Sequence, residues 1–284
     1  MDINWSYKNK SRVFDTKENG GVPYLSFKAL DDTGLAVNGF STRMGGASRG
    51  KFSTMNFSYS RGDAAEDVLE NFTRMAAALG VERDRMVVSH QTHTVNLRRV
   101  TLEDAGKGVI RERDYRDIDG LITDVPGLTL VTFYADCVPL YLLDPVNRAI
   151  GLSHSGWRGT VKRMGQVMVD AMKEAFGTKP EDLIACVGPS ICRDCFEVGG
   201  EVVEEFREAF GPEHREALYC QGKRPGKYQL DLWKANEIIF REAGIRRENI
   251  HITNICTMCN SDYLFSHRKV GEERGNLAAF LCLK

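Results

Sequence analysis

The 284-residue chain has almost no net charge and contains no long apolar run. Its 38 Lys and Arg nearly balance 39 Asp and Glu, which gives a formal net charge of -1. Proteins that bind nucleic acid or membrane surfaces commonly carry an overall basic field or a Lys/Arg block, and this chain has neither. No stretch approaches the ~20 apolar residues of a transmembrane helix, and the opening sequence MDINW does not resemble a signal peptide. We therefore expect a cytoplasmic protein without nucleic-acid or membrane partners.

Without an export signal, the eight cysteines are best interpreted as reduced thiols or metal ligands rather than as disulfides. The composition, 42% hydrophobic and 27% charged, is that of a globular protein with an ample core. The chain has no internal repeat, low-complexity segment or clear linker. A single α/β domain over residues 1–284 is the simplest organisation.

The central feature of the sequence is a predicted β-hairpin that carries a thiol and an imidazole. Residues 128–134 form an apolar run typical of a buried strand, followed by Asp136 and Cys137. A second apolar run at 138–143 leads into the turn signature DPVN, and residues 148–153 return to His154. Because the two arms are of similar length, we expect Cys137 and His154 to approach each other.

Other elements follow from hydrophobic periodicity and from Gly or Pro stops. Helices are predicted at 64–79, 160–176, 200–210 and 231–243. Strands are predicted within 22–40 and at 183–187, 250–255, 265–268 and 277–281.

Three side chains near the hairpin are candidate zinc ligands: Cys137, His154 and either His90 or His93. One thiolate and two imidazoles suit zinc, and a fourth position left open is typical of a catalytic site. Alternatively, Cys137 is a nucleophile, His154 its base, and Asp136 or a backbone carbonyl the orienting group. The residues are equally compatible with a buried thiol and hydrogen-bonded core histidines, because the site requires three distant segments to converge.

Two further features carry potential ligands. Cys192, Cys195, Cys256 and Cys259 form two C-x-x-C pairs that could hold a structural zinc. The roughly sixty residues between the pairs exceed the usual ribbon spacing, which favours cysteine as a small core residue instead. The glycine-rich loop at 41–48 contains Arg43 and could cradle an anion, although an ordinary surface loop is the more economical interpretation.

Taken together, the motifs resemble the YfiH or laccase-domain family, also described as multicopper polyphenol oxidoreductases. The resemblance covers about residues 39–283 and leaves 1–20 as an N-terminal extension. It is carried by the stretches STRMGG (41–46), QTH (91–93), DCVP (136–139), HSGWRG (154–159), GPSI (188–191), FEVG (196–199), LDL (230–232), CT (256–257) and FSHR (265–268).

The resemblance implies a layered α/β sandwich of one domain with a zinc site at His93, Cys137 and His154. By analogy, it selects His93 over His90. It also implies a purine nucleoside phosphorylase acting on adenosine, inosine and 5′-methylthioadenosine, with adenosine deaminase activity. Nucleoside and phosphate would be the small-molecule partners; the oligomeric state is not predicted.

On this hypothesis, Arg43 with its glycine loop, together with Arg158, binds phosphate, and Gln91 contributes to the substrate site. Asp136 tunes Cys137 or a histidine from behind. Many members of the family have Gly-Arg where this chain has Gly275-Asn276, and Arg274 is the residue that would substitute.

Two alternatives and one exclusion complete the functional prediction. A multicopper oxidase needs many more imidazoles than the six histidines present here, so polyphenol oxidation with copper is disfavoured. The runner-up activity is a cysteine hydrolase or amidase, acting on a peptidoglycan precursor through Cys137 and His154. A metal-binding protein without enzymatic activity is the non-catalytic alternative.

Overall fold

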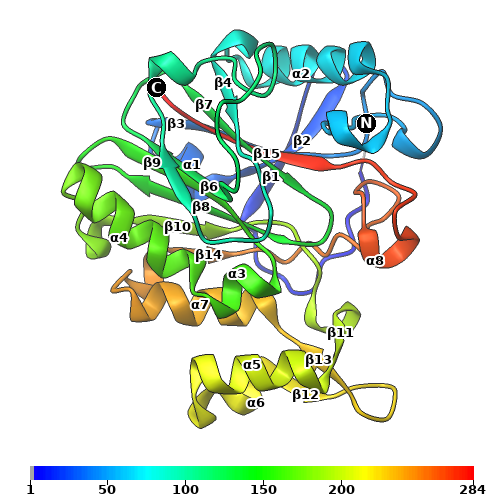
Figure 1. The fold of residues 1–284 in the computed structure, drawn as a ribbon, viewed down its shortest axis with the longest axis vertical. Coiled ribbons are helices and arrows are strands. Elements are labelled where there is room, and N and C mark those ends of the chain that lie inside the picture. Colours follow the sequence, from blue (N-terminus) through cyan, green and yellow to red (C-terminus); the bar gives the residue numbers. More distant parts are fainter. Residues whose placement is uncertain (1–2) are drawn as a thin grey trace.

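The computed structural model describes residues 3–284 as two six-stranded sheets packed face to face, with helices on both outer faces (Figure 1). This is a four-layer arrangement, and it confirms the predicted α/β sandwich. The first sheet has the order β1-β2-β3-β15-β7-β4. Its strands are β1 (Phe14–Asn19), β2 (Val22–Phe27), β3 (Ala36–Ser41), β15 (Leu277–Leu283), β7 (Thr129–Tyr134) and β4 (Met86–Val88).

The second sheet has the order β14-β10-β8-β9-β6-β5. Its strands are β14 (Ile250–Ile252), β10 (Ile184–Val187), β8 (Val138–Asp144), β9 (Ala149–Ser155), β6 (Gly120–Thr123) and β5 (Leu97–Arg99). The predicted hairpin is its centre, since β8 and β9 pair in antiparallel register along their full length. Strand β7, which precedes the hairpin, belongs to the first sheet, so the chain crosses from one sheet to the other at Ala135–Cys137.

The fold is completed by helices. They are α1 (Lys28–Asp31), α2 (Ala65–Leu79), α3 (Trp157–Val161), α4 (Met164–Phe176), α5 (Gly200–Phe210), α6 (Arg215–Leu218), α7 (Leu232–Glu242) and α8 (His267–Val270). Figure 1 shows α2 on one side of the sheets and α3, α4 and α7 on the other. The apolar stripe of α4 is core, because Met168 and Met172 are fully buried against the second sheet. A small sheet, β11 (Glu197–Gly199), β13 (Lys227–Leu230) and β12 (Tyr219–Gln221), lies with α5 and α6 at one end of the molecule.

Two local predictions are wrong. The helix predicted at 160–176 is divided into α3 and α4, because Arg163 adopts a left-handed conformation (φ 61°) between them. The strand predicted at 265–268 is instead the approach to α8, where the Ser266 hydroxyl accepts a hydrogen bond from the Lys269 N–H at 3.3 Å. A serine in this position satisfies one of the free N–H groups of a helix start.

The described part of the N-terminal segment packs onto this core. Strand β1 extends the first sheet by pairing with β2. Trp5 is buried between the sheets, and its indole N–H donates to the Thr16 hydroxyl at 2.8 Å. Between residues 3 and 284, none of the helices combines the length and apolar character needed to cross a membrane.

Candidate active site

The structure brings His93, Cys137 and His154 together from three separate segments. Their potential ligand atoms all lie within 4.8 Å of one another. The two imidazole rings stand nearly perpendicular (83°) with centroids 4.9 Å apart. The predicted convergence is therefore present, and it includes His93 rather than His90.

Cys137 and His154 meet because of the hairpin register. Pro139 pairs with His154 and Val138 pairs with Ser155. Cys137 immediately precedes β8 and therefore lies at the open end of the hairpin, beside the end of β9. His93 comes from the loop that follows β4 and has a left-handed backbone (φ 65°). That turn interrupts the extended geometry that would place His90 and His93 on opposite faces of one strand.

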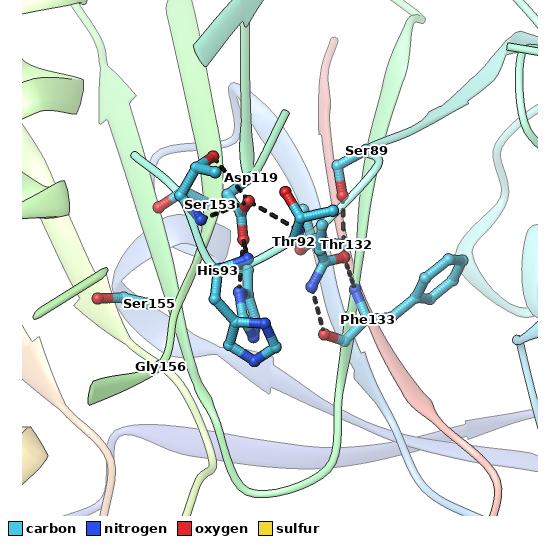
Figure 2. Close-up of polar contacts among 12 residues, drawn as sticks. Ser89, Thr92, His93, Asp119, Thr132, Phe133, Ser153, Ser155 and Gly156 are labelled. Carbon is cyan, nitrogen blue, oxygen red and sulfur yellow. Dashed lines mark hydrogen bonds and ion pairs between the residues drawn. The ribbon is translucent and has the colours of Figure 1, made fainter. Parts of the chain in front are cut away.

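Asp119 organises this corner of the molecule (Figure 2). Its fully buried carboxylate accepts backbone N–H bonds from Thr92 (3.0 Å), His93 (3.0 Å) and Thr94 (2.9 Å). The same carboxylate lies 2.9 Å from Nδ1 of His154, and its own backbone carbonyl accepts the His154 N–H at 2.8 Å. Asp119 thus fixes the position of both histidines.

The Asp119 contact also sets the tautomer of His154. A carboxylate accepts only, so Nδ1 of the ring carries a proton, and in the neutral ring Nε2 presents its lone pair. A histidine held from behind by a carboxylate is the usual arrangement of a metal-ligating imidazole.

Strong electrostatic coupling links the three central groups. Burial raises the pKa of Cys137, but the charges and hydrogen bonds of His154 and His93 outweigh it and lower that pKa to about 6. Burial lowers the pKa of His154, but the Cys137 thiolate and Asp119 raise it to about 9. For Asp119, burial acts to raise the pKa, whereas His154 and the backbone N–H groups lower it to about 2. Without a metal, the group is a thiolate–imidazolium pair backed by a carboxylate.

The absence of a side chain at Gly156 leaves room for the Cys137 thiol and the His93 imidazole. A Cβ atom at this position would lie 3.0 Å from Sγ of Cys137 and 3.3 Å from Cδ2 of His93. Both distances are tighter than ordinary van der Waals contact, so any larger residue would push the thiol or the imidazole aside.

The three side chains border a cavity of about 370 Å³, a volume that falls within the usual range for small-molecule sites. Three arginines, Arg61, Arg113 and Arg274, line the cavity, and none of the described residues that line it is Asp or Glu. The other lining residues are polar or aromatic: Ser58, Tyr59, Ser60, Ser89, His90, Gln91, Phe133, Tyr134 and Asn276, together with Gly108 and Ala135.

Of the predicted substrate-binding residues, the cavity contains Gln91 but neither Arg43 nor Arg158. The Gln91 amide is engaged by the Phe133 backbone, donating at 2.7 Å and accepting at 2.7 Å, so it shapes the wall. The Arg43 guanidinium donates to the carbonyls of Ser53 and Ser261 and borders a different hollow. Arg158 is exposed and stacks on Trp157. The prediction that these two arginines bind phosphate at this site is not supported by their positions.

The Asp136 carboxylate makes its hydrogen bonds to residues other than His93, Cys137 and His154. It accepts hydrogen bonds from the Thr257 hydroxyl and the Arg268 N–H, both at 2.6 Å, and Asp136 is not among the residues that line the cavity. The carboxylate that contacts His154 is Asp119, which is not among the site residues predicted from the sequence. Its position directly before β6, opposite the second arm of the hairpin, is the signal that could have identified it.

The four cysteines of the C-x-x-C pairs form a second convergence. Sulfur atoms of Cys192, Cys195, Cys256 and Cys259 all lie within 4.8 Å of one another. The argument from sequence spacing against such a cluster is therefore wrong.

The fold and the site together define a four-layer α/β protein with a His-Cys-His metal-type site at a solvent-reachable, arginine-lined cavity. Residues 37–284 match the family model described as "Multi-copper polyphenol oxidoreductase laccase", and the chain belongs to this family. The predicted resemblance is confirmed.

Named relatives are similar along most of their length. The chain is 34% identical to "Purine nucleoside phosphorylase YlmD" of Geobacillus stearothermophilus, over 87% of this chain and 89% of the relative. It is also 34% identical to "Adenosine deaminase RL5" from an unknown prokaryotic organism, over 84% and 91%. The crystal structure of Bacillus licheniformis hypothetical protein YfiH superposes with a TM-score of 0.89 at 29% identity, covering 96% of this chain and all of that one.

Proposed function

We propose that this protein is a purine nucleoside phosphorylase that cleaves adenosine, inosine and 5′-methylthioadenosine with phosphate. The observation that carries the proposal is the cavity beside His93, Cys137 and His154, which three arginines line and no described carboxylate enters. Such a cavity suits a phosphate anion. The names of the relatives support the same activity.

The residues present fit a zinc ion. His154 offers Nε2 because Asp119 occupies Nδ1, Cys137 favours its thiolate form, and Gly156 leaves the space between them. We therefore propose zinc at His93, Cys137 and His154 rather than copper, since one thiolate and two imidazoles make a typical zinc donor set. When bound, zinc in a three-ligand site supplies Lewis acidity at one open coordination position.

Arg274 is the best placed phosphate ligand. Its side chain is buried and lines the cavity, and its Nη1 donates to the Gly275 carbonyl (3.1 Å) and to Asn276 Oδ1. Burial lowers the pKa of Arg274 to about 10, which still leaves it charged at neutral pH. A phosphate oxygen in the cavity would pair with this cation through a charge-assisted hydrogen bond. Arg61, whose Nε donates to the Arg274 carbonyl at 3.2 Å, and Arg113 supply further positive charge.

The remaining lining of the cavity suits the nucleoside. Tyr59 and Phe133 provide aromatic surface for a purine, and serine hydroxyls and Asn276 provide hydrogen-bonding groups for ribose. His90 accepts the Asp117 N–H at Nδ1 (3.2 Å), so its neutral ring carries the proton on Nε2. That N–H can be donated to the departing base.

The reaction then proceeds by exchange of bonds at C1′ of the ribose. The bond between C1′ and the purine nitrogen breaks with both electrons leaving on the base, and a phosphate oxygen forms the new bond to C1′. The arginines hold the nucleophile against the sugar, which reduces the entropic cost of the encounter. His90 donates a hydrogen bond to the base as negative charge develops on it, and the base takes its proton from water.

Adenosine deamination is proposed as a secondary activity. Known zinc deaminases use a carboxylate as general acid and base beside the metal. The described lining of this cavity has no carboxylate, and His90 is a weaker substitute. We therefore expect phosphorolysis to exceed deamination.

The test is incubation with inosine or adenosine, with and without phosphate. Release of free hypoxanthine or adenine only when phosphate is present supports the phosphorylase. Base release at the same rate without phosphate, or no turnover with any purine nucleoside, contradicts it; the latter would leave a metal-binding protein without enzymatic activity.

A cysteine hydrolase or amidase that acts on a peptidoglycan precursor is the second candidate, because the metal-free pair favours a Cys137 thiolate beside a His154 imidazolium. A hydrolase would form a covalent adduct with its substrate on Cys137 in the protein as isolated. A zinc thiolate would instead resist iodoacetamide until a chelator removes the metal. We also propose that the enzyme works in the cytoplasm, where its eight cysteines remain free thiols or metal ligands.

A further inference from the structure

The two C-x-x-C pairs meet because of the topology of the second sheet. Strands β10 and β14 are parallel neighbours, so their carboxyl ends lie at the same edge. Cys192 and Cys195 follow β10, and Cys256 and Cys259 follow β14, with a bridge between Ser190 and Cys256 continuing the pairing. The intervening chain, β11 to α7, is the crossover between the two strands. A separation of about sixty residues therefore brings the pairs together rather than keeping them apart.

The geometry of the four sulfurs suits one metal ion. Tetrahedral zinc with Zn–S distances near 2.3 Å places its sulfurs about 3.8 Å apart. Here all four lie within 4.8 Å, and Cys195 and Cys259 are 3.5 Å apart. An iron–sulfur cluster must fit several irons and inorganic sulfides between its thiolates, and so requires wider spacing.

Polar groups around the sulfurs favour negative charge. The Cys192 backbone N–H donates to Sγ of Cys256 at 3.3 Å. Lys8 lies beside the cluster, where it pairs with Asp194 at 2.9 Å, and Arg268 donates to the carbonyls of Cys195 (3.4 Å) and Glu197 (2.8 Å). Four thiolates around one divalent ion carry a net charge of -2, which these donors and cations stabilise. Cys192 and Cys256 are buried while Cys259 is exposed, so an ion can enter from solvent.

We propose that Cys192, Cys195, Cys256 and Cys259 hold a structural zinc ion that is distinct from the candidate active site. The site is closed by four thiolates, the donor set of structural rather than catalytic zinc. It fastens the loop after β10 to the loop after β14.

The same two loops hold the residue next to Cys137. Thr257, between the cysteines of the second pair, donates its hydroxyl to Asp136 Oδ1 at 2.6 Å. Ile191, which directly precedes Cys192, donates its N–H to the Asp136 carbonyl at 3.0 Å. Asp136 has a left-handed backbone (φ 88°), which is uncommon for a residue with a side chain and which these two hydrogen bonds help to hold. The structural zinc thus supports the turn that directs Cys137, and Asp136 is a positioning residue.

Zinc content tests the site independently of turnover. We expect two zinc ions per chain in the purified protein and one in the double variant Cys195→Ser/Cys259→Ser. Cys220→Ser changes an exposed cysteine outside the cluster and should retain two. The double variant His93→Ala/His154→Ala should retain one, which shows the tetrathiolate site without disturbing its cysteines.

The outcomes separate this proposal from the proposed function. One zinc ion in both the wild type and the histidine variant would support the tetrathiolate site and would show that the active site binds no zinc. No zinc in the histidine variant would overturn the tetrathiolate site. Iron with acid-labile sulfide, or a Cys195–Cys259 disulfide found after alkylation of free thiols in the freshly isolated protein, would also overturn it.

The link to Cys137 has its own test, which rests on zinc at the proposed catalytic site. Thr257→Val removes the hydroxyl that binds Asp136, whereas Thr257→Ser keeps it. We expect the valine variant to retain the structural zinc but to bind the second zinc about tenfold more weakly, the usual effect of removing a supporting hydrogen bond. The serine variant should restore wild-type affinity. Equal affinity in all three proteins would refute the positioning role.

Discussion

Replacing Asp119 with Asn tests the arrangement of the candidate active site most directly. Both oxygens of Asp119 accept hydrogen bonds: Oδ1 from His154 Nδ1 and the His93 N–H, and Oδ2 from the N–H groups of Thr92 and Thr94 and from the Thr94 hydroxyl. An amide NH₂ cannot accept any of these bonds. In either orientation of the asparagine amide, its NH₂ group therefore faces at least two other hydrogen-bond donors and can accept from none of them.

The magnitude follows from the contacts that are lost. If the NH₂ replaces Oδ1, two hydrogen bonds to a charged acceptor disappear, each of which contributes about 1.5–3 kcal/mol, so stability falls by about 3–6 kcal/mol. If His154 turns Nδ1 into an acceptor instead, its proton moves to Nε2 and the ligand lone pair is lost. We expect zinc affinity at this site to fall at least 10–100-fold, with purine release reduced accordingly.

The assay is competition for zinc with a chelator at neutral pH, together with phosphate-dependent base release and thermal unfolding. Asp117→Asn is the matched control, because Asp117 is an exposed neighbour whose carboxylate accepts a bond from the Thr92 hydroxyl and which does not touch either histidine ligand. Its left-handed backbone (φ 55°) also tolerates asparagine. An Asp119→Asn protein that binds zinc and turns over like the Asp117→Asn control would refute the role assigned to this carboxylate.

Three further substitutions or conditions probe the same site. Gly156→Ala should weaken zinc binding at least tenfold, because its Cβ would lie 3.0 Å from the sulfur of Cys137. Gly159→Ala is the control and should bind zinc normally, because the nearest atom to its Cβ lies at 3.5 Å. Equal zinc affinity of the two variants would show that Gly156 is not needed to make room for the ligands. Arg274→Gln should raise the KM for phosphate about tenfold or more, while Arg43→Gln, outside the cavity, should leave it unchanged; initial rates at varied phosphate decide, and the reverse pattern would restore the prediction from sequence. In metal-free protein, alkylation of Cys137 by iodoacetamide should rise as the pH increases through about 6, because its pKa is lowered and the thiolate forms above that value; a rise only near pH 8–9 would show an unperturbed thiol.

The part of the site that the sequence predicts is the part built from adjacent strands. An apolar run, a turn signature and a second run of equal length determine which residues face each other, so Cys137 and His154 could be brought together without coordinates. His93 could not, because its position depends on a left-handed turn after a three-residue strand, and the choice over His90 came from family resemblance.

The arginines illustrate why binding residues are harder to predict. Arg43 lies in a glycine-rich loop that matches the family, but its guanidinium is consumed by two backbone carbonyls. Arg274 also donates to two oxygens, those of the Gly275 carbonyl and the Asn276 side chain, but the fold places it in the wall of the cavity, where Arg43 does not lie. Local sequence shows which residues are charged, whereas tertiary packing determines which of them remain free to bind a ligand.

The location of the active site explains why its ligands are so scattered along the chain. The chain passes from the first sheet to the second at Asp136 and Cys137, between β7 and β8. His93 follows a strand of the first sheet, and His154 belongs to a strand of the second. The ligands lie where the two sheets meet, so the affinity for a metal ion there depends on the position of one sheet relative to the other. Any relaxation of the turn between β7 and β8 would separate Cys137 from the histidines. The loops that hold Asp136 follow β10, the neighbour of β8, and β14, the edge strand beyond it, so the cysteine cluster and the active site are connected through one residue although they share no ligand.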